Sequence, residues 1–228
     1  MKFFTRNKKL GPSILSFNLP VIDSCPGSSE ACEAVCYARN GYFRYPRNQL
    51  LNDKKFDASK APFFVQRAID ELRRTSLRRV RVHSSGDFYD RAYVGKWRRI
   101  ATALPEFSFC AYTRSWRLHE MLDEFKVLAQ LPNFELWFSA DRFTGLPPQV
   151  ENVRACWLLE VELPPQPKPR QLPVELIFPT KDKDRVRFKQ HGSAIVCPNY
   201  GGSPVGEKLT CSECGFCWTR RERKEDTM

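Results

Sequence analysis

The sequence lacks long apolar runs and an N-terminal export signal. No stretch approaches the ~18 consecutive apolar residues that cross a membrane, and the first ten residues, MKFFTRNKKL, lack the apolar segment of a secretory signal. These two absences argue against membrane-spanning and exported proteins. We therefore expect a soluble, cytoplasmic protein with no membrane partner.

Histidine is scarce, and no nucleophile motif is present. The three histidines are His83, His119 and His191, which limits zinc sites that use imidazole ligands. A hydrolase using His83 or His119 with Asp87 is a weak alternative, because one close His–Asp pair occurs often by chance. We interpret His83 as a hydrogen-bonding residue at a strand end.

What the chain does have is a sizeable apolar fraction and a strong positive charge. Its 228 residues are 42% hydrophobic, enough for one substantial core. Lys and Arg number 37 against 26 Asp and Glu, a formal net charge of +11. This balance favours anionic partners and is compatible with a nucleotide or nucleic-acid substrate.

Short apolar runs rich in β-branched and aromatic residues alternate with helical segments, a pattern typical of a parallel sheet with crossover helices. The expected strands are Arg79–His83, Phe107–Tyr112, Phe134–Ser139, Ala155–Val161, Leu172–Phe178 and Ser193–Val196. The expected helices are Ala61–Thr75, Arg91–Thr102 and Trp116–Ala129. We expect one α/β domain over residues 1–196, followed at 197–228 by a cysteine-rich, metal-binding extension with a basic tail.

Polar residues follow three of the expected strands. They are Ser85, Gly86 and Asp87 after the first, Arg114 after the second, and Ser139 with Asp141 at the end of the third. Parallel α/β folds build their sites at the carboxyl ends of strands. Taken alone, each residue is better explained as a helix cap, but three successive occurrences favour a binding site.

Nine cysteines gather mainly at the two ends of the chain. In a reducing compartment, clustered thiols indicate metal ligands more than disulfides. Near the N-terminus, Cys25, Cys32 and Cys36 form a Cys-x6-Cys-x3-Cys array followed by Tyr37. Three thiolates suit a [4Fe–4S] cluster with one open iron; zinc with an added histidine is the alternative.

The C-terminal set has Cys211, Cys214 and Cys217 at Cys-x2-Cys-x2-Cys spacing, with Cys197 as the fourth ligand. Four ligands would close this site, as a second [4Fe–4S] cluster or, alternatively, as a zinc site. Cys110 and Cys156 lie within apolar runs and are interpreted as buried structural thiols.

A family resemblance rests on several ordered segments. They are LGPSILSFNLPVIDSCPGSSEACEAVCYA, VRVHSSGDFYD, FCAYTRSW, WFSADRFTG and a closing CP followed by CSECGFCW. Together they resemble the gene product 88 family of phage and plasmid proteins over nearly the whole chain. That resemblance implies an origin in mobile elements and implies no reaction.

The sequence also resembles, more loosely, radical S-adenosylmethionine (SAM) proteins. This resemblance implies a partial, open (β/α) barrel of mainly parallel strands, with Cys25, Cys32 and Cys36 as cluster ligands and Tyr37 beside the cluster. It further implies that SAM lies against Ser85, Gly86 and Asp87, with Arg114, Ser139 and Asp141 lining the cofactor or substrate. The usual spacing in that family is Cys-x3-Cys-x2-Cys, from which this sequence departs.

Two functions follow from these observations. The leading hypothesis is a radical SAM-type enzyme with an open N-terminal cluster, a second C-terminal cluster and an external electron donor. The alternative is a non-catalytic protein in which zinc or inert iron–sulfur clusters stabilise a nucleic-acid-binding surface. The alternative explains the charge as well, but it leaves the recurring Ser, Gly and Asp residues at strand ends unexplained.

Overall fold

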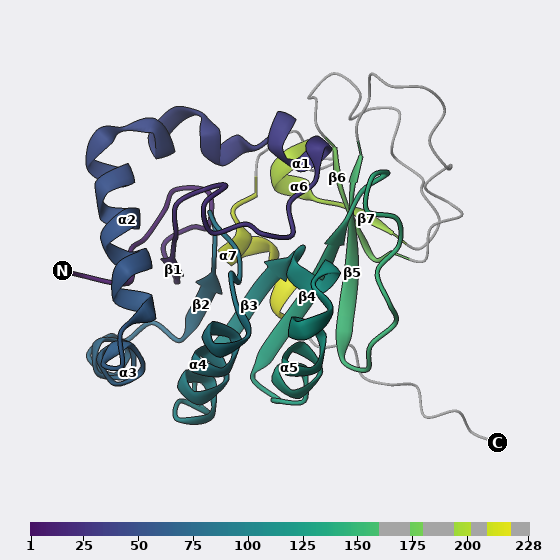
Figure 1. Ribbon diagram of the computed structural model, residues 1–228. Coiled ribbons are helices and arrows are strands. Elements are labelled where there is room, and N and C mark those ends of the chain that lie inside the picture. The colour runs from purple at the N-terminus through teal and green to yellow at the C-terminus, as the bar shows by residue number, and fades with distance from the viewer. Residues whose placement is uncertain (160–173, 180–193, 202–208, 220–228) are drawn as a thin grey trace.

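The computed structural model describes residues 1–159, 174–179, 194–201 and 209–219, and these residues form an α/β fold built on one parallel sheet (Figure 1). Seven strands pair in parallel in the order in which they occur along the chain, which is the strand order of a barrel. The sheet curls into a half-barrel. The strands are β1 (Ile14–Phe17), β2 (Arg79–Val82), β3 (Ser108–Thr113), β4 (Phe134–Ala140), β5 (Val153–Leu159), β6 (Leu176–Pro179) and β7 (Ile195–Val196).

The longer helices are α2 (Pro46–Lys60), α3 (Phe64–Arg73), α4 (Arg91–Thr102) and α5 (His119–Ala129). The amphipathic helices α3, α4 and α5 cover the convex face of the sheet, and α4 and α5 lie in front of the central strands in Figure 1. Helix α4 illustrates why these segments form helices that pack on the sheet. Its buried residues recur at helical spacing and form one apolar face. At its start, the Asp90 side chain accepts a hydrogen bond from the Tyr93 backbone N–H.

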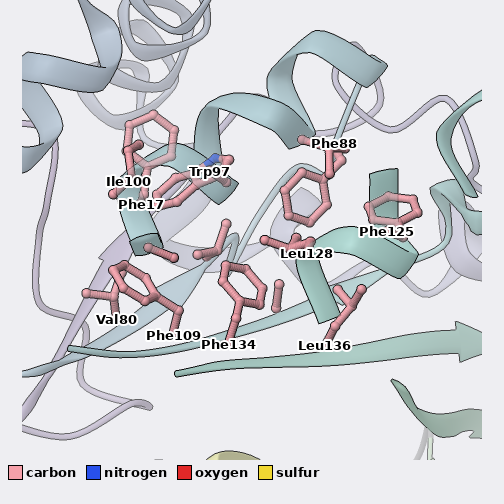
Figure 2. Packing of buried hydrophobic residues seen from close by; sticks show 14 of the residues in the cluster. Phe17, Val80, Phe88, Trp97, Ile100, Phe109, Phe125, Leu128, Phe134 and Leu136 are labelled. Atoms are coloured by element: carbon pink, nitrogen blue, oxygen red, sulfur yellow. The ribbon is translucent and has the colours of Figure 1, made fainter. Parts of the chain in front are cut away.

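The main core lies between these helices and the sheet (Figure 2). Trp97 and Ile100 of α4 and Phe125 of α5 are fully buried against outward-facing strand residues such as Phe109 and Leu136. Side chains alternate between the two faces of a strand, so every second residue of the central strands enters this core. Burial of each such large side chain contributes about 1.5–3 kcal/mol.

The intervening residues of the same strands face the concave side, where polar and apolar groups mix. Arg81, Cys110, Tyr112 and Trp137 lie on this side, and a second, smaller apolar cluster forms around Trp137, Cys110 and Cys156. The C-terminal turns, α7 (Cys211–Cys214) and η6 (Phe216–Trp218), pack against this cluster. The concave side is therefore partly filled by the cysteine-rich C-terminal segment.

The expected partial, open α/β barrel of mainly parallel strands is observed as a half-barrel of parallel strands, and helix Arg91–Thr102 has the expected bounds. The other predicted elements match to within a few residues where they are described. The resemblance to radical SAM folds and the division at residue 196 stay predictions. Residues 160–173, 180–193 and 220–228, which include His191 and the basic tail, lie outside the described part of the chain.

Strand β1 and helix α2 are among the elements that were not predicted. Strand β1 is only 4 residues long, and helix α2 has no apolar stripe because its sequence, PRNQLLNDKKFDASK, spreads polar residues over all faces. Among the described residues, no helix is long and apolar enough to cross a membrane.

Candidate functional site at the carboxyl ends of the strands

The loop that follows β1 carries the N-terminal cysteines. Helix α1 (Glu30–Ala34) holds Cys32, and the Ser29 hydroxyl caps this helix by accepting a hydrogen bond from the Cys32 backbone N–H at 3.1 Å. The Cys25, Cys32 and Cys36 thiols lie within electrostatic range of one another. Burial raises the pKa of Cys25 to about 12 and also raises the pKa of Cys32, where the nearby Arg114 guanidinium opposes the rise.

The loop after β2 packs directly on the cysteine loop. Gly86 has φ +80°, and a Cβ at this position would lie 2.5 Å from both Leu19 Cβ and Ser24 Oγ. The Ser85 hydroxyl donates to the Leu19 carbonyl at 2.9 Å, and the Asp87 backbone N–H donates to the Ser24 carbonyl at 3.1 Å. Only glycine fits this close approach of two backbones.

The buried Asp87 carboxylate joins β2 to β3. Its oxygens accept the backbone N–H of Phe88 at 2.7 Å and of Arg114 at 2.8 Å. Burial raises its pKa to about 6, and hydrogen bonds from Thr113 and Arg114 limit the rise. Thr113 also donates to this carboxylate, so about one of its roughly four acceptor positions is left for a hydrogen bond from a ligand amine.

Asp141, directly after β4, is fully buried. It neutralises the Arg114 charge and fixes the position of the cysteine loop. It pairs with the Arg114 guanidinium at 2.5 Å and accepts a hydrogen bond from the Ser29 hydroxyl at 2.5 Å. Arg117 adds hydrogen bonds to the Gly27 and Ser28 carbonyls. Asp87, Arg114 and Asp141, which were predicted from separate strand ends, thus meet around the cysteine loop.

Tyr37 and Ser139 occupy different places. The Tyr37 side chain is 42% exposed, but its hydroxyl is turned inward and donates a hydrogen bond to the Ser84 carbonyl. Removal of this hydroxyl from water raises the tyrosine pKa to about 12. The Ser139 side chain hydrogen-bonds Cys156 on the concave face, and Cys156 lies within electrostatic range of the Arg114 guanidinium. The predicted set is therefore brought together in part: Tyr37 lies at the cysteine loop, whereas Ser139 faces the barrel interior.

The C-terminal cysteines surround a small cavity. Cys197 follows β7, Cys211 and Cys214 lie on α7, and Cys217 lies on η6 after a turn at Gly215, which has φ +67°. All four cysteines line one cavity of about 20 Å³. The Tyr112 hydroxyl donates to the Cys217 Sγ at 2.8 Å, and burial raises the pKa of the Cys217 thiol.

The concave face of the sheet holds this cysteine-rich turn in place. The Arg154 guanidinium donates to the Phe216 carbonyl at 3.1 Å and to the Thr219 carbonyl at 2.9 Å, and it packs 3.8 Å from the Trp137 ring. The Trp137 indole N–H donates to the Cys217 carbonyl at 3.2 Å. These contacts join the C-terminal segment to the half-barrel.

Both cysteine sets suit thiolate-binding metals in their chemistry, because sulfur ligands favour iron–sulfur clusters and zinc. The four C-terminal cysteines also line one cavity. Within the described residues, no group of three or more His, Cys, Asp or Glu side chains is already placed to hold a metal ion. Metal binding would therefore need the thiols to turn toward a common point.

Two cations lie between the cysteine sets and were missed by sequence reasoning. The Lys9 ammonium lies 4.6 Å from the Tyr37 ring centre and within electrostatic range of Cys197 and Cys211. The Arg81 guanidinium lies 4.0 Å from the Tyr112 ring centre. The alternation of side chains along β2 could have predicted that Arg81 faces the interior. No local sequence pattern predicts the position of Lys9. Ser29 was also missed, although a helix-cap search could have found it.

The other cysteines and the histidine considered above, Cys110, Cys156 and His83, have structural roles. Cys110 and Cys156 are fully buried, as predicted. His83 Nε2 lies 2.9 Å from the Tyr93 hydroxyl, and burial lowers the histidine pKa to about 3. A neutral, buried imidazole fits the predicted hydrogen-bonding role at a strand end.

The fold and this site define an α/β half-barrel protein with a cysteine-bearing loop held at the carboxyl ends of its strands. The chain belongs to the gene product 88 family, whose model matches residues 2–220. It is 26% identical over 212 residues to the Gene 88 protein of Mycobacterium phage L5, covering 85% of this chain and 77% of that protein. No solved structure matches the chain. These matches concern the family and leave the radical SAM resemblance a prediction.

Proposed function

We propose that this protein is an iron–sulfur enzyme of the radical SAM type that acts on a nucleotide or nucleic-acid substrate. One observation carries the proposal: the loop bearing Cys25, Cys32 and Cys36 contacts Asp87, Arg114 and Asp141 or their neighbours at the carboxyl ends of parallel strands. This edge is where α/β barrels build their active sites.

In this proposal the three N-terminal cysteines would ligate a [4Fe–4S] cluster. Such a cluster, once reduced by an electron donor, supplies electrons to a bound cofactor such as SAM. Gly86 lets the β2 loop backbone approach a ligand. The Asp87 carboxylate would accept the ligand's amine, while Asp141 positions the cysteine loop through Ser29.

The C-terminal set can supply a complete ligand set from its own thiols. Cys197, Cys211, Cys214 and Cys217 line one small cavity, and four thiolates are the full tetrahedral ligand set of a structural zinc ion. We therefore propose that these four cysteines hold zinc, with a second [4Fe–4S] cluster as the competing outcome.

A second candidate function is a non-catalytic, metal-stabilised nucleic-acid-binding protein. It is favoured by the net charge of +11 together with the closed, four-thiol arrangement of the C-terminal set, because a zinc ion held by four thiolates has a structural role only. Under this function neither cysteine set would respond to SAM.

Metal analysis of protein purified without oxygen separates these functions. We expect about four irons, about four sulfides and about one zinc per chain, and an electron paramagnetic resonance signal of the dithionite-reduced protein that shifts when SAM is added. About eight irons and no zinc would indicate that the C-terminal cysteines hold a second [4Fe–4S] cluster. Zinc alone, with no iron, would contradict the enzyme and support the binding protein.

Variants assign each metal to its cysteines. Cys32→Ala is expected to remove iron and the SAM-responsive signal and to keep zinc, whereas Cys214→Ala is expected to remove zinc and keep iron. Cys156→Ala is the matched control, because this thiol is buried outside both sets and its loss should leave both metals bound. Equal loss of both metals in Cys32→Ala and Cys214→Ala would contradict two separate sites.

A further inference from the structure

The segment between the cysteine loop and helix α2 has an unusual composition. Residues 37–47, YARNGYFRYPR, contain three tyrosines, one phenylalanine and three arginines. No Asp or Glu occurs anywhere from residue 37 to residue 52. Figure 1 shows the segment running along the upper edge of the molecule from α1 to the start of α2. We refer to residues 37–47 as the aromatic–basic segment.

Two of its aromatic rings face solvent. Tyr42 is 66% exposed and Tyr45 is 60% exposed, and their ring centres lie 5.8 Å apart with planes at 83°. Single exposed apolar side chains are ordinary on protein surfaces. A pair of exposed rings in edge-to-face contact within one short segment is a more specific feature, because most of their surface is open to a ligand.

The backbone beneath these rings is held in place. The Asn48 side-chain amide donates to the Tyr42 carbonyl at 2.7 Å, and the Tyr45 carbonyl accepts the backbone N–H groups of Asn48 and Gln49. Pro46 begins helix α2, where its fixed φ suits the first helical turn. The rings are thus presented by a short, hydrogen-bonded turn.

The arginines of the segment have no carboxylate partner within the described residues. Arg44 and Arg47 make no ion pair there, and Arg39 donates to the Glu33 backbone carbonyl only. Guanidinium groups bind phosphates in a bidentate manner and stack on flat rings. Unpaired arginines beside exposed tyrosines therefore combine the two contacts that single-stranded nucleic acid offers, phosphates and base faces.

The aromatic–basic segment also connects to the candidate site. The Phe43 and Tyr37 ring centres lie 5.8 Å apart, and the Tyr37 hydroxyl donates to the Ser84 carbonyl in the loop after β2. A single-stranded nucleic acid bound on Tyr42 and Tyr45 would consequently pass beside the cysteine loop.

From these observations we infer that the aromatic–basic segment binds single-stranded nucleic acid, with Tyr42 and Tyr45 stacking on bases and Arg44 and Arg47 contacting phosphates. The inference rests on the proposed function for what happens to the bound strand. Binding itself needs neither iron nor SAM, so the two proposals can fail separately.

The test is fluorescence anisotropy of the purified full-length protein with labelled oligonucleotides of about 16 nucleotides, the upper range of single-strand site sizes. The arms are single-stranded DNA, single-stranded RNA and duplex DNA of the same sequence. We expect the better of the two single strands to bind at least about tenfold more tightly than the duplex, because duplex bases are already stacked. Equal binding of duplex and single strand would overturn the stacking role.

Surface variants locate the contact. Tyr42→Ala with Tyr45→Ala should weaken single-strand binding at least about tenfold, since stacking on each base contributes a large part of such affinity, whereas Tyr42→Phe with Tyr45→Phe should retain it. Arg44→Ala with Arg47→Ala should reduce the slope of log affinity against log salt by about 1.4. Phe63→Ala is the aromatic control, because Phe63 is 53% exposed elsewhere; its affinity should match the unaltered protein.

Two outcomes would overturn the inference. One is unchanged affinity of the double tyrosine variant when its circular dichroism spectrum and melting temperature match those of the unaltered protein. The other is binding to phosphatidylglycerol vesicles without binding to any oligonucleotide, which would identify the segment as a membrane-surface contact.

Discussion

Two buried carboxylates connect the candidate site at the scale of single residues, and they do so by different means. Asp141 pairs with the Arg114 guanidinium and accepts the Ser29 hydroxyl, so its charge is compensated. Asp87 accepts backbone N–H groups from Phe88 and Arg114, and burial raises its pKa to about 6. The two carboxylates should therefore respond differently to substitution and to pH.

Asp141→Asn should destabilise the protein by about 3–5 kcal/mol, because it leaves the Arg114 charge buried without its partner. Urea unfolding followed by circular dichroism measures the change. Asp123→Asn is the matched control, since Asp123 forms an exposed pair with Lys126 and its loss should have no measurable effect. Equal small effects of both substitutions would contradict the buried pair.

Asp87 should make stability depend on pH. Its folded pKa of about 6 lies above the usual value of 3.8, so between these values the folded state binds more protons than the unfolded state and stability falls as pH rises. The contribution of Asp87 to the free energy of unfolding should drop by about 2 kcal/mol from pH 4 to pH 7.

Urea unfolding of the unaltered protein and of Asp87→Asn across that pH range checks this prediction. The variant should lack the decline that begins above pH 4. Asp123→Asn should keep it, because Lys126 lowers the pKa of Asp123 and its proton leaves at lower pH. Parallel pH profiles for the unaltered protein and Asp87→Asn would show that Asp87 has no raised pKa.

At the scale of elements, two short loops determine whether the cysteine sets can act as sites. The β2 loop packs so closely on the cysteine loop that residue 86 has no room for a Cβ. The C-terminal turn is joined to the sheet through Arg154 and Trp137. Each arrangement depends on a few contacts between segments far apart in the sequence.

Gly86→Ala should destabilise the protein more than Gly145→Ala. Both glycines have positive φ, +80° and +68°, so both substitutions carry a backbone strain of about 1–2 kcal/mol. Only at Gly86 would the new Cβ meet neighbouring atoms at 2.5 Å, whereas nothing lies within 4 Å at Gly145. Thermal unfolding of the two variants tests this; equal losses would mean that the two loops are not in close contact.

Arg154→Lys should expose the C-terminal cysteines. Arg154 binds Glu175 through Nε and the Phe216 and Thr219 carbonyls through Nη1. A lysine keeps the charge but has only one nitrogen, so it cannot hold the carboxylate and both carbonyls in this fork geometry. Alkylation by iodoacetamide, followed by peptide mass spectrometry, should be several-fold faster at Cys211, Cys214 and Cys217.

Arg78→Lys is the matched control for this experiment. Arg78 also donates to two backbone carbonyls and packs on a ring, that of Phe107. Its replacement should leave the alkylation rates unchanged. Faster alkylation in both variants would indicate a general loosening of the fold and would contradict a specific role of Arg154.

At the scale of the whole molecule, the C-terminal turns cover the second apolar cluster of the sheet, so metal bound there should stabilise the entire half-barrel. A metal present at 100 times its dissociation constant contributes about 2.7 kcal/mol. Removing the proposed zinc ion with a chelator should therefore lower the melting temperature by roughly 5–10 °C. Scanning calorimetry measures it, and Cys214→Ala should melt early and show no further response.

Much of the fold could be predicted, because helix Arg91–Thr102 and the central strands have strong periodic patterns. Strand β1 was missed because 4 residues carry too short a pattern, and helix α2 because its polar residues surround it. Asp87, Arg114 and Asp141 were predicted from strand ends alone. Their actual partners, such as Ser29, could not be, since hydrogen bonds between distant segments leave no local signal.

The sequence by itself determined the alternation of strands and helices, the two cysteine sets and the polar residues at strand ends. These are local patterns, set by side-chain periodicity and spacing. Only the tertiary structure decided that Asp141 holds the cysteine loop, that Ser139 faces the interior, and that Lys9 and Arg81 lie between the two cysteine sets. The reason is that curling of the parallel sheet brings together residues whose separation along the chain exceeds any local pattern.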